Sequence, residues 1–220
     1  MPADSWDVDV QIVVVAKEPV PGRVKTRLTP PLTPLTAARV AAAALVDTLQ
    51  SVAETPVVRR TVALAGAAGP WLPEGFAVIQ QRGDGLDERL ASAFEDAQQV
   101  YPAPVLLIGM DTPHITASLL HASCRALLAE GNDAVIGPAT DGGWWAMGLR
   151  RAERDLLVGV PMSTSRTFDE QLGRLRRAAL SVTLLPILTD VDDVRTGHEV
   201  ARQCPRSRFA AEWNAAAVVP

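Results

Sequence analysis

The segment VDVQIVVVAKEPVPGRVKTRL, residues 8–28, indicates the fold class of this chain. Its first part, residues 8–16, is rich in valine and isoleucine, which is typical of a strand buried on both faces of a sheet. The run ends in a loop that contains Pro19, Pro21 and Gly22, residues that favour a defined irregular backbone path. A strand of this kind predicts a parallel sheet that helices cover.

Segments of helical and strand type alternate along the rest of the chain. Further strands are predicted at residues 57–65, 76–80, 104–109, 133–137, 144–149 and 180–188. Helices are predicted at residues 35–52, with Thr36 as the cap, 86–100, 117–130, 167–179, 194–203 and 208–217. This alternation predicts one α/β domain over residues 1–220, a three-layer αβα sandwich with a mostly parallel central sheet.

Composition excludes several classes of protein. With 48% hydrophobic and 21% charged residues, the chain is too apolar for disorder. Its formal net charge of −4 argues against broad binding of nucleic acid, and no apolar run approaches the length of a membrane span. The acidic N-terminus is unlike a signal peptide, and the two cysteines form no CxxC motif. We therefore expect a reduced, cytoplasmic protein with neither nucleic acid nor membrane as a partner.

A cluster of cations follows the first strand. Residues 17–39 contain five basic residues and one acid. The candidate phosphate-binding residues there are Lys17, Gly22, Arg23, Lys25 and Arg27. Because clustered cations repel one another and Arg binds phosphate oxygens in a bidentate manner, a polyphosphate is the favoured partner, and a solvated basic patch is the alternative. The loop contains neither the GxxxxGK[ST] nor the GxGxxG pattern.

Carboxylates follow two later strands. Asp111 lies in IGMDTP, residues 108–113, and Asp190, Asp192 and Asp193 lie in LPILTDVDDV, residues 185–194. Because ligands collect at the carboxyl ends of strands in such folds, Asp111, Asp190 and Asp192 are the candidate ligands of Mg²⁺ or Mn²⁺. The alternatives are that Asp111 belongs to a turn or a helix cap, and that Asp192 or Asp193 caps the following helix.

Three other loops carry candidate binding residues. In GPATDGGWWAMGL, residues 137–149, Gly142 and Gly143 allow a ligand to approach the backbone closely, and one of the two tryptophans is expected in the core. The further candidates are Asp141, Trp144 and Trp145 in that segment, Gly83, Asp84 and Arg89 before the second helix, and Ser163 and Thr164 in MSTSRTF, residues 162–168. Together, the basic loop and the carboxylates suit a metal-dependent enzyme that handles a nucleotide diphosphate or triphosphate.

These motifs, in this order, resemble a bacterial family of glycosyltransferase-like proteins of the GT-A, nucleotide-diphospho-sugar transferase fold, some of which are labelled arsenosugar-biosynthesis glycosyltransferases. The segment KTRLTPPLTPLTAARVAAAALVDTL is also similar to the opening of 2-phospho-L-lactate and phosphoenolpyruvate guanylyltransferases. The chain departs from the first family's pattern where Trp144 and Trp145 replace an aromatic pair such as Tyr-Tyr, where Met162 replaces a Trp, and where Asp193 replaces a Thr. These departures leave the identity of the acceptor open.

The resemblance implies metal-dependent transfer of a glycosyl group from a nucleotide sugar to a small-molecule acceptor. In that interpretation the basic loop holds the phosphates, Asp111 with Asp190 or Asp192 binds the metal, and Asp141, Gly142 and Gly143 form the acceptor side, with Asp141 as the candidate catalytic base. The first alternative is transfer of a nucleotidyl group from an NTP to a phosphorylated small acid, and the second is a nucleotide-binding protein without catalysis. The sequence leaves a homodimer open.

Overall fold

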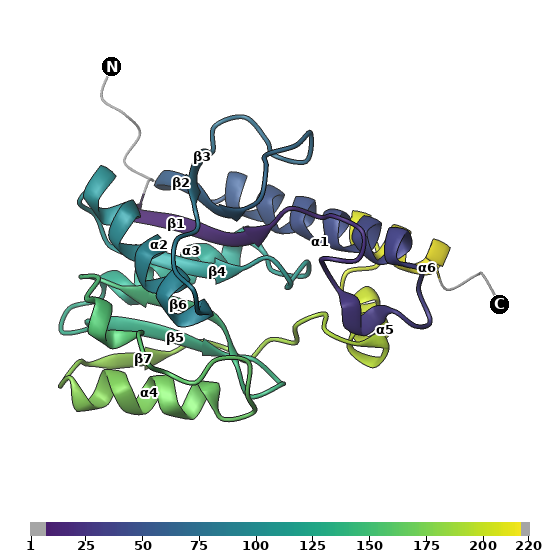
Figure 1. Cartoon of the computed structure of the whole chain (residues 1–220). Helices are drawn as coiled ribbons and strands as arrows, with labels where there is room; N and C mark the ends of the chain where they lie inside the picture. The colour runs from purple at the N-terminus through teal and green to yellow at the C-terminus, as the bar shows by residue number, and fades with distance from the viewer. Residues whose placement is uncertain (1–7, 217–220) are drawn as a thin grey trace, which may run out of the picture.

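The structure, a computed structural model, describes residues 8–216 as a seven-stranded sheet between helices. The strands are β1 (Val8–Lys17), β2 (Val57–Ala65), β3 (Ala77–Gln80), β4 (Val105–Gly109), β5 (Ala134–Pro138), β6 (Trp144–Leu149) and β7 (Val182–Leu184). The helices are α1 (Pro34–Ala53), α2 (Leu86–Val100), α3 (Ala117–Leu128), α4 (Thr167–Arg177), α5 (Val194–Gln203) and α6 (Arg208–Ala216), with short 3-10 turns η1 (Thr26–Leu28) and η2 (Arg154–Leu156) (Figure 1). The predicted alternation of strands and helices is confirmed.

The sheet has the order β3-β2-β1-β4-β6-β5-β7, and β6 runs antiparallel to both of its neighbours. The other pairs are parallel, so the prediction of a mostly parallel sheet is confirmed. β1 is an interior strand between β2 and β4, and its side chains from Val10 to Val14 are fully buried, as expected for a strand covered on both faces.

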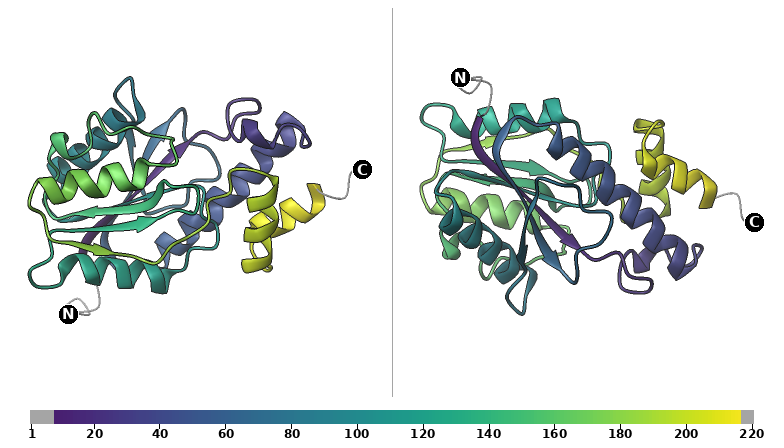
Figure 2. Two further views of the ribbon diagram at one scale, coloured as in Figure 1. Left: turned by 90° about the horizontal axis from the view of Figure 1, so that it is seen from below. Right: turned by 90° about the horizontal axis from the view of Figure 1, so that it is seen from above.

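Two helix layers cover the sheet, as Figure 2 shows in views from below and above. α1 and α3 pack on one face through Leu45, Leu49 and Leu120, whereas α2 and α4 pack on the other through Phe94 and Leu175. The expected three-layer sandwich is confirmed. No helix within residues 8–216 has the length and apolarity needed to cross a bilayer.

A smaller third core joins the two C-terminal helices to the first part of α1 (Figure 1). Phe209 and Trp213 of α6 and Val200 of α5 are buried there against α1. The buried carboxylate of Asp47 on α1 accepts hydrogen bonds from the backbone N–H groups of Arg208, at 3.2 Å, and Phe209, at 2.7 Å. These N–H groups at the start of α6 have no partner within their own helix, so α1 caps α6 from outside.

Two predictions at the ends of elements were wrong. The cap of α1 is Thr33 rather than Thr36, because Pro34 occupies the first helical position and the Thr33 hydroxyl accepts the N–H of Thr36 at 3.1 Å. The predicted strand 180–188 shrinks to β7, because Pro186 has no N–H for the sheet and Leu188 makes only an isolated bridge. The last predicted helix, 208–217, is α6 as far as Ala216, and residue 217 lies outside the described residues.

Candidate functional site

A cavity of about 650 Å³ opens at the carboxyl ends of the central strands. The loops after β1, β3 and β4, the turn between β5 and β6, and the segments before α4 and α5 form its walls. Of the predicted site residues, it is lined by Lys17, Arg23, Lys25, Arg27, Asp111, Asp141, Gly143, Trp144, Ser163, Thr164, Asp190 and Asp192. The structure therefore confirms that these predicted residues lie together at this edge of the sheet. Their binding roles stay predictions.

Lys25 links the basic loop to the carboxylates. Its Nζ lies 2.6 Å from Oδ1 of Asp111 and donates to the backbone carbonyl of Val191. The Lys25 side chain is only 7% exposed, whereas that of Asp111 is 41% exposed. One oxygen of Asp111 is therefore engaged, and the carboxylate still faces the cavity.

The other cations are more open. Arg27 forms an ion pair with Asp192 in which both side chains are substantially exposed. Lys17 and Arg23 are exposed, and no carboxylate within residues 8–216 pairs with them. These two side chains remain available for an anion.

Asp190 is a partly buried acid of the site. Its pKa is raised to about 7, first by burial and then by the neighbouring carboxylates of Asp111 and Asp141, while Lys25 opposes them. The segment that carries Asp190 is held at the end of β4, since the N–H of Val191 donates to the carbonyl of Asp111 at 3.0 Å. Asp190 is thus able to hold or release a proton close to neutral pH.

The alternative cap assignments are now resolved. Thr116 caps α3, accepting the N–H of Leu119 at 3.2 Å, so Asp111 is not a cap. Asp193 caps α5 in a capping box with Thr196, which leaves Asp192 on the cavity.

The turn between β5 and β6 is built around Asp141. Its Oδ1 accepts the N–H of Gly143 at 2.8 Å, which holds the carboxylate at the turn. Gly142 has φ +89°, and a Cβ there would lie 2.1 Å from the carbonyl oxygen of Ser165. This glycine therefore permits close contact between the turn and the start of α4, without lining the cavity itself.

The two tryptophans of β6 point in opposite directions. Trp145 is buried in the core and donates from Nε1 to the carbonyl of Pro186 at 2.9 Å, while Trp144 lines the cavity. The prediction that one of the pair belongs to the core is confirmed, since neighbouring strand residues alternate between faces.

The loop before α2 differs from expectation. Gly83, Asp84 and Arg89 do not line the cavity, and neither does Gly22, whose φ of +77° serves its turn. Arg89 instead donates to the carbonyl of Gly83 at 3.0 Å and so closes the loop. The cavity is lined there by Gln81, Leu86 and Leu90, which the sequence reasoning missed. The position of Gln81 directly after a predicted strand is the feature that would have revealed it.

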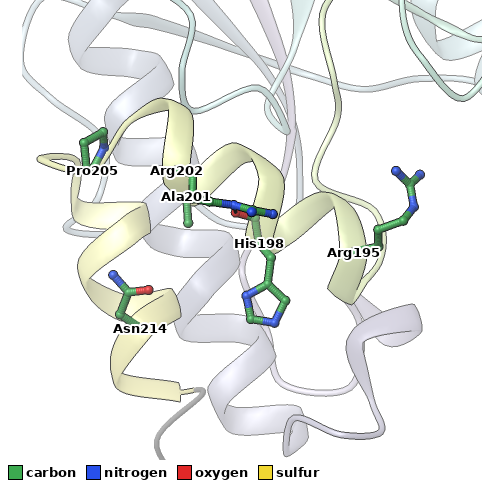
Figure 3. Close-up of a pocket in the computed structure, with 6 residues that line it drawn as sticks. All are labelled: Arg195, His198, Ala201, Arg202, Pro205 and Asn214. Carbon is green, nitrogen blue, oxygen red and sulfur yellow. Dashed lines mark hydrogen bonds between the residues drawn. The ribbon is translucent and has the colours of Figure 1, made fainter.

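A second cavity, of about 660 Å³, lies between α5 and α6, away from the strand ends (Figure 3). The His198 ring accepts the Trp213 Nε1–H at Nδ1 over 3.1 Å, and Arg202 donates to the His198 carbonyl. Arg195 extends away from the His198 ring (Figure 3). None of the predicted site residues lines this cavity, so the strand-end cavity is the candidate site.

Comparison with known proteins agrees with this geometry. The family model described as "uncharacterized protein conserved in bacteria (DUF2064)" matches residues 45–164. The chain is similar to the crystal structure of a provisionally named nucleotide-diphospho-sugar transferase from Desulfovibrio desulfuricans G20, with a TM-score of 0.85, 27% identity and 94% of each chain covered. The expected nucleotide-diphospho-sugar transferase fold is confirmed. A search of curated proteins finds no match.

Two more distant structures share the fold alone. One is CMP:2-keto-3-deoxy-manno-octonic acid synthetase complexed with CTP, with a TM-score of 0.57 and 13% identity over 90% of this chain and 99% of that one. The other is Rv0371C from Mycobacterium tuberculosis H37Rv in complex with manganese, with a TM-score of 0.52 and 19% identity over 89% of this chain and 99% of that one.

Proposed function

The chain belongs to the DUF2064 family of bacterial proteins, and we propose that it is a transferase acting on a nucleotide-activated substrate. The proposed reaction is transfer of a glycosyl group from a nucleotide-diphospho-sugar to a small acceptor. The observation that carries this proposal is the strand-end cavity, where a basic loop and several carboxylates face one space. Its similarity to a provisionally named nucleotide-diphospho-sugar transferase over 94% of both chains supports the same class.

The basic loop would hold the diphosphate. Lys17 and Arg23 are the cations of the basic loop that have no ion pair with a described carboxylate, so they can bind phosphate oxygens at little cost in broken contacts. Positive side chains that offset the charge of a departing diphosphate stabilise the transition state of such a transfer. Asp141, held at its turn by the N–H of Gly143, is the candidate base on the acceptor side.

A divalent cation fits this site with the help of the substrate. No group of three His, Cys, Asp or Glu side chains within residues 8–216 is placed to bind a metal ion. Asp111 is partly exposed at the cavity, and Mg²⁺ is commonly held by one or two carboxylates together with substrate phosphates. We therefore assign Asp111, with Asp190 or Asp192, as the protein ligands of Mg²⁺ or Mn²⁺. When bound, such an ion neutralises charge on the leaving diphosphate.

The proposal is tested by thermal shift and product analysis. With Mn²⁺ or Mg²⁺ present, a nucleoside diphosphate or its sugar conjugate should raise Tm, since a ligand of the native state stabilises it. Asp111→Asn should remove the part of the shift that needs metal, whereas Asp9→Asn, an exposed carboxylate at the other end of β1, should keep it. No shift with any nucleotide in the unaltered protein would contradict the proposal.

Nucleotidyl transfer is the second candidate. The exposed Lys17 and Arg23 would also suit the additional phosphate of an NTP. Release of pyrophosphate when an NTP and a phosphorylated acid are supplied together, with no transfer from nucleotide sugars, would favour this reaction over glycosyl transfer.

A further inference from the structure

The cavity between α5 and α6 is lined by hydrogen-bond donors. His198 and Arg202 stand on α5, and Asn214 stands on α6 (Figure 3). Arg195, in the first turn of α5, lines the same cavity with a side chain that is 76% exposed. No carboxylate is among the lining residues that the structure describes. A cavity with two guanidinium groups and no acid favours a negatively charged ligand.

The free donor of His198 is set by the contact of its ring with α6. Its Nδ1 lies 3.1 Å from Nε1 of Trp213, and the two rings meet edge to face. An indole N–H only donates a hydrogen bond, so Nδ1 accepts it and the neutral ring carries its proton on Nε2. Within residues 8–216, no group accepts a hydrogen bond from that Nε2–H. The His198 ring therefore keeps one donor for a ligand.

The two guanidinium groups are available to an anion. Nε of Arg202 donates to the carbonyl of His198 at 3.1 Å, one turn earlier in α5, which orients the group. Its terminal nitrogens make no hydrogen bond or ion pair within the described part of the chain. Arg195 lies 3.6 Å from Glu199 in an exposed pair, and such pairs contribute little to stability. An anion can therefore bind both arginines without breaking a strong contact.

The size of the cavity indicates a ligand larger than a single anion. Its volume of about 660 Å³ is within the usual range of small-molecule pockets. Ala201 and Pro205 add an apolar wall beside the donors. A phosphate group matches the donors, because its oxygens accept several hydrogen bonds at once from arginine and other N–H groups. The atoms attached to the phosphate would then occupy the space along the apolar wall.

We propose that the cavity between α5 and α6 binds a phosphorylated small molecule, whose phosphate is held by Arg202, the Nε2–H of His198 and the amide of Asn214. This site is separate from the strand-end cavity, since the two share no described lining residue. Asp192 lines one cavity and Arg195 the other, before and after the residue at which α5 begins. The proposal does not depend on the transferase activity proposed above.

The test follows the indole N–H signal of Trp213 by NMR at constant ionic strength. Because this group bonds to His198, its signal reports a ligand in this cavity rather than one at the basic loop. The probes are glycerol 3-phosphate, inorganic phosphate and glycerol. The variants are Arg202→Gln, which removes a cation of the cavity, and Asn214→Asp, which adds a negative charge. The control is Arg206→Gln, which removes the charge of an exposed arginine outside the cavity.

Glycerol 3-phosphate should shift the Trp213 signal saturably and bind more tightly than inorganic phosphate, whereas glycerol should cause no shift. Arg202→Gln and Asn214→Asp should each weaken glycerol 3-phosphate about fivefold or more, and Arg206→Gln should leave its affinity nearly unchanged. The inference is overturned if glycerol 3-phosphate gives no saturable shift, or if Arg202→Gln and Arg206→Gln weaken it equally. Equal or tighter binding of inorganic phosphate would overturn the assignment to a phosphorylated small molecule.

Discussion

Asp190→Asn should change how the stability of this protein depends on pH. The carboxyl of Asp190 has its pKa raised to about 7 by burial and by the nearby carboxylates of Asp111 and Asp141. In the unfolded chain its pKa returns to about 3.9. Between these values the folded state holds a proton that the unfolded state has released, so stability falls as pH rises.

The magnitude follows from the pKa difference. The contribution is fully present below about pH 4 and is lost as pH rises through about 7, with a slope of about 1.4 kcal/mol per pH unit. Between pH 5 and pH 8 the carboxyl of Asp190 passes through about two units of this range, so unfolding free energy should fall by roughly 3 kcal/mol. Asparagine has a similar shape and does not titrate, so Asp190→Asn should lack this part of the pH dependence.

Urea unfolding at pH 5, 6, 7 and 8, with EDTA to remove divalent cations, measures the effect. The unaltered protein should lose stability relative to Asp190→Asn across this series. Asp155→Asn, which removes an exposed carboxylate on η2, should follow the unaltered protein. Parallel pH profiles for the unaltered protein and Asp190→Asn would refute the assignment of a raised pKa to this carboxyl group.

Three further outcomes are expected. Lys25→Met removes the cation beside Asp111, so calorimetry should show nucleotide affinity reduced about tenfold or more, and unchanged affinity would contradict its role in the site. Gly197→Ala places a Cβ 2.1 Å from the ring of Trp213, so urea unfolding should show a loss of about 1–3 kcal/mol, and a neutral effect would mean that α5 and α6 separate freely. Asp47→Ala leaves two backbone N–H groups at the start of α6 unpaired, so the same assay should show a loss of about 1–3 kcal/mol without weaker nucleotide binding, and weaker binding would link this cap to the site.

Local patterns in the sequence were sufficient for much of the fold. The buried run at residues 8–16 became β1, an interior strand of the sheet, because a segment apolar on both sides is stable only where both faces are covered. The same patterns did not reveal that β6 is antiparallel, since strand direction depends on the connection and leaves no trace in the composition of the strand.

The sequence predicted most of the residues that form the candidate site, but not the contacts between them. Placing the polar residues at strand ends brought Lys25, Asp111 and Asp190 to one cavity, as the rule for such sheets predicts. That Lys25 is buried against Asp111, and that burial shifts the pKa of Asp190, follow from the packing of loops distant in sequence. Arg89 was a predicted binding residue, but its guanidinium donates to the carbonyl of Gly83 in its own loop, a contact that the local sequence did not reveal.

The sequence by itself determined the class of fold and the charges that gather at one end of the sheet, because strand periodicity and the residues after each strand are local properties. Only the tertiary structure decided which of those charges are neutralised and which donors are left free. Desolvation and hydrogen-bond pairing depend on neighbours from several elements at once: the ring of His198 on α5 is oriented by Trp213, which belongs to α6.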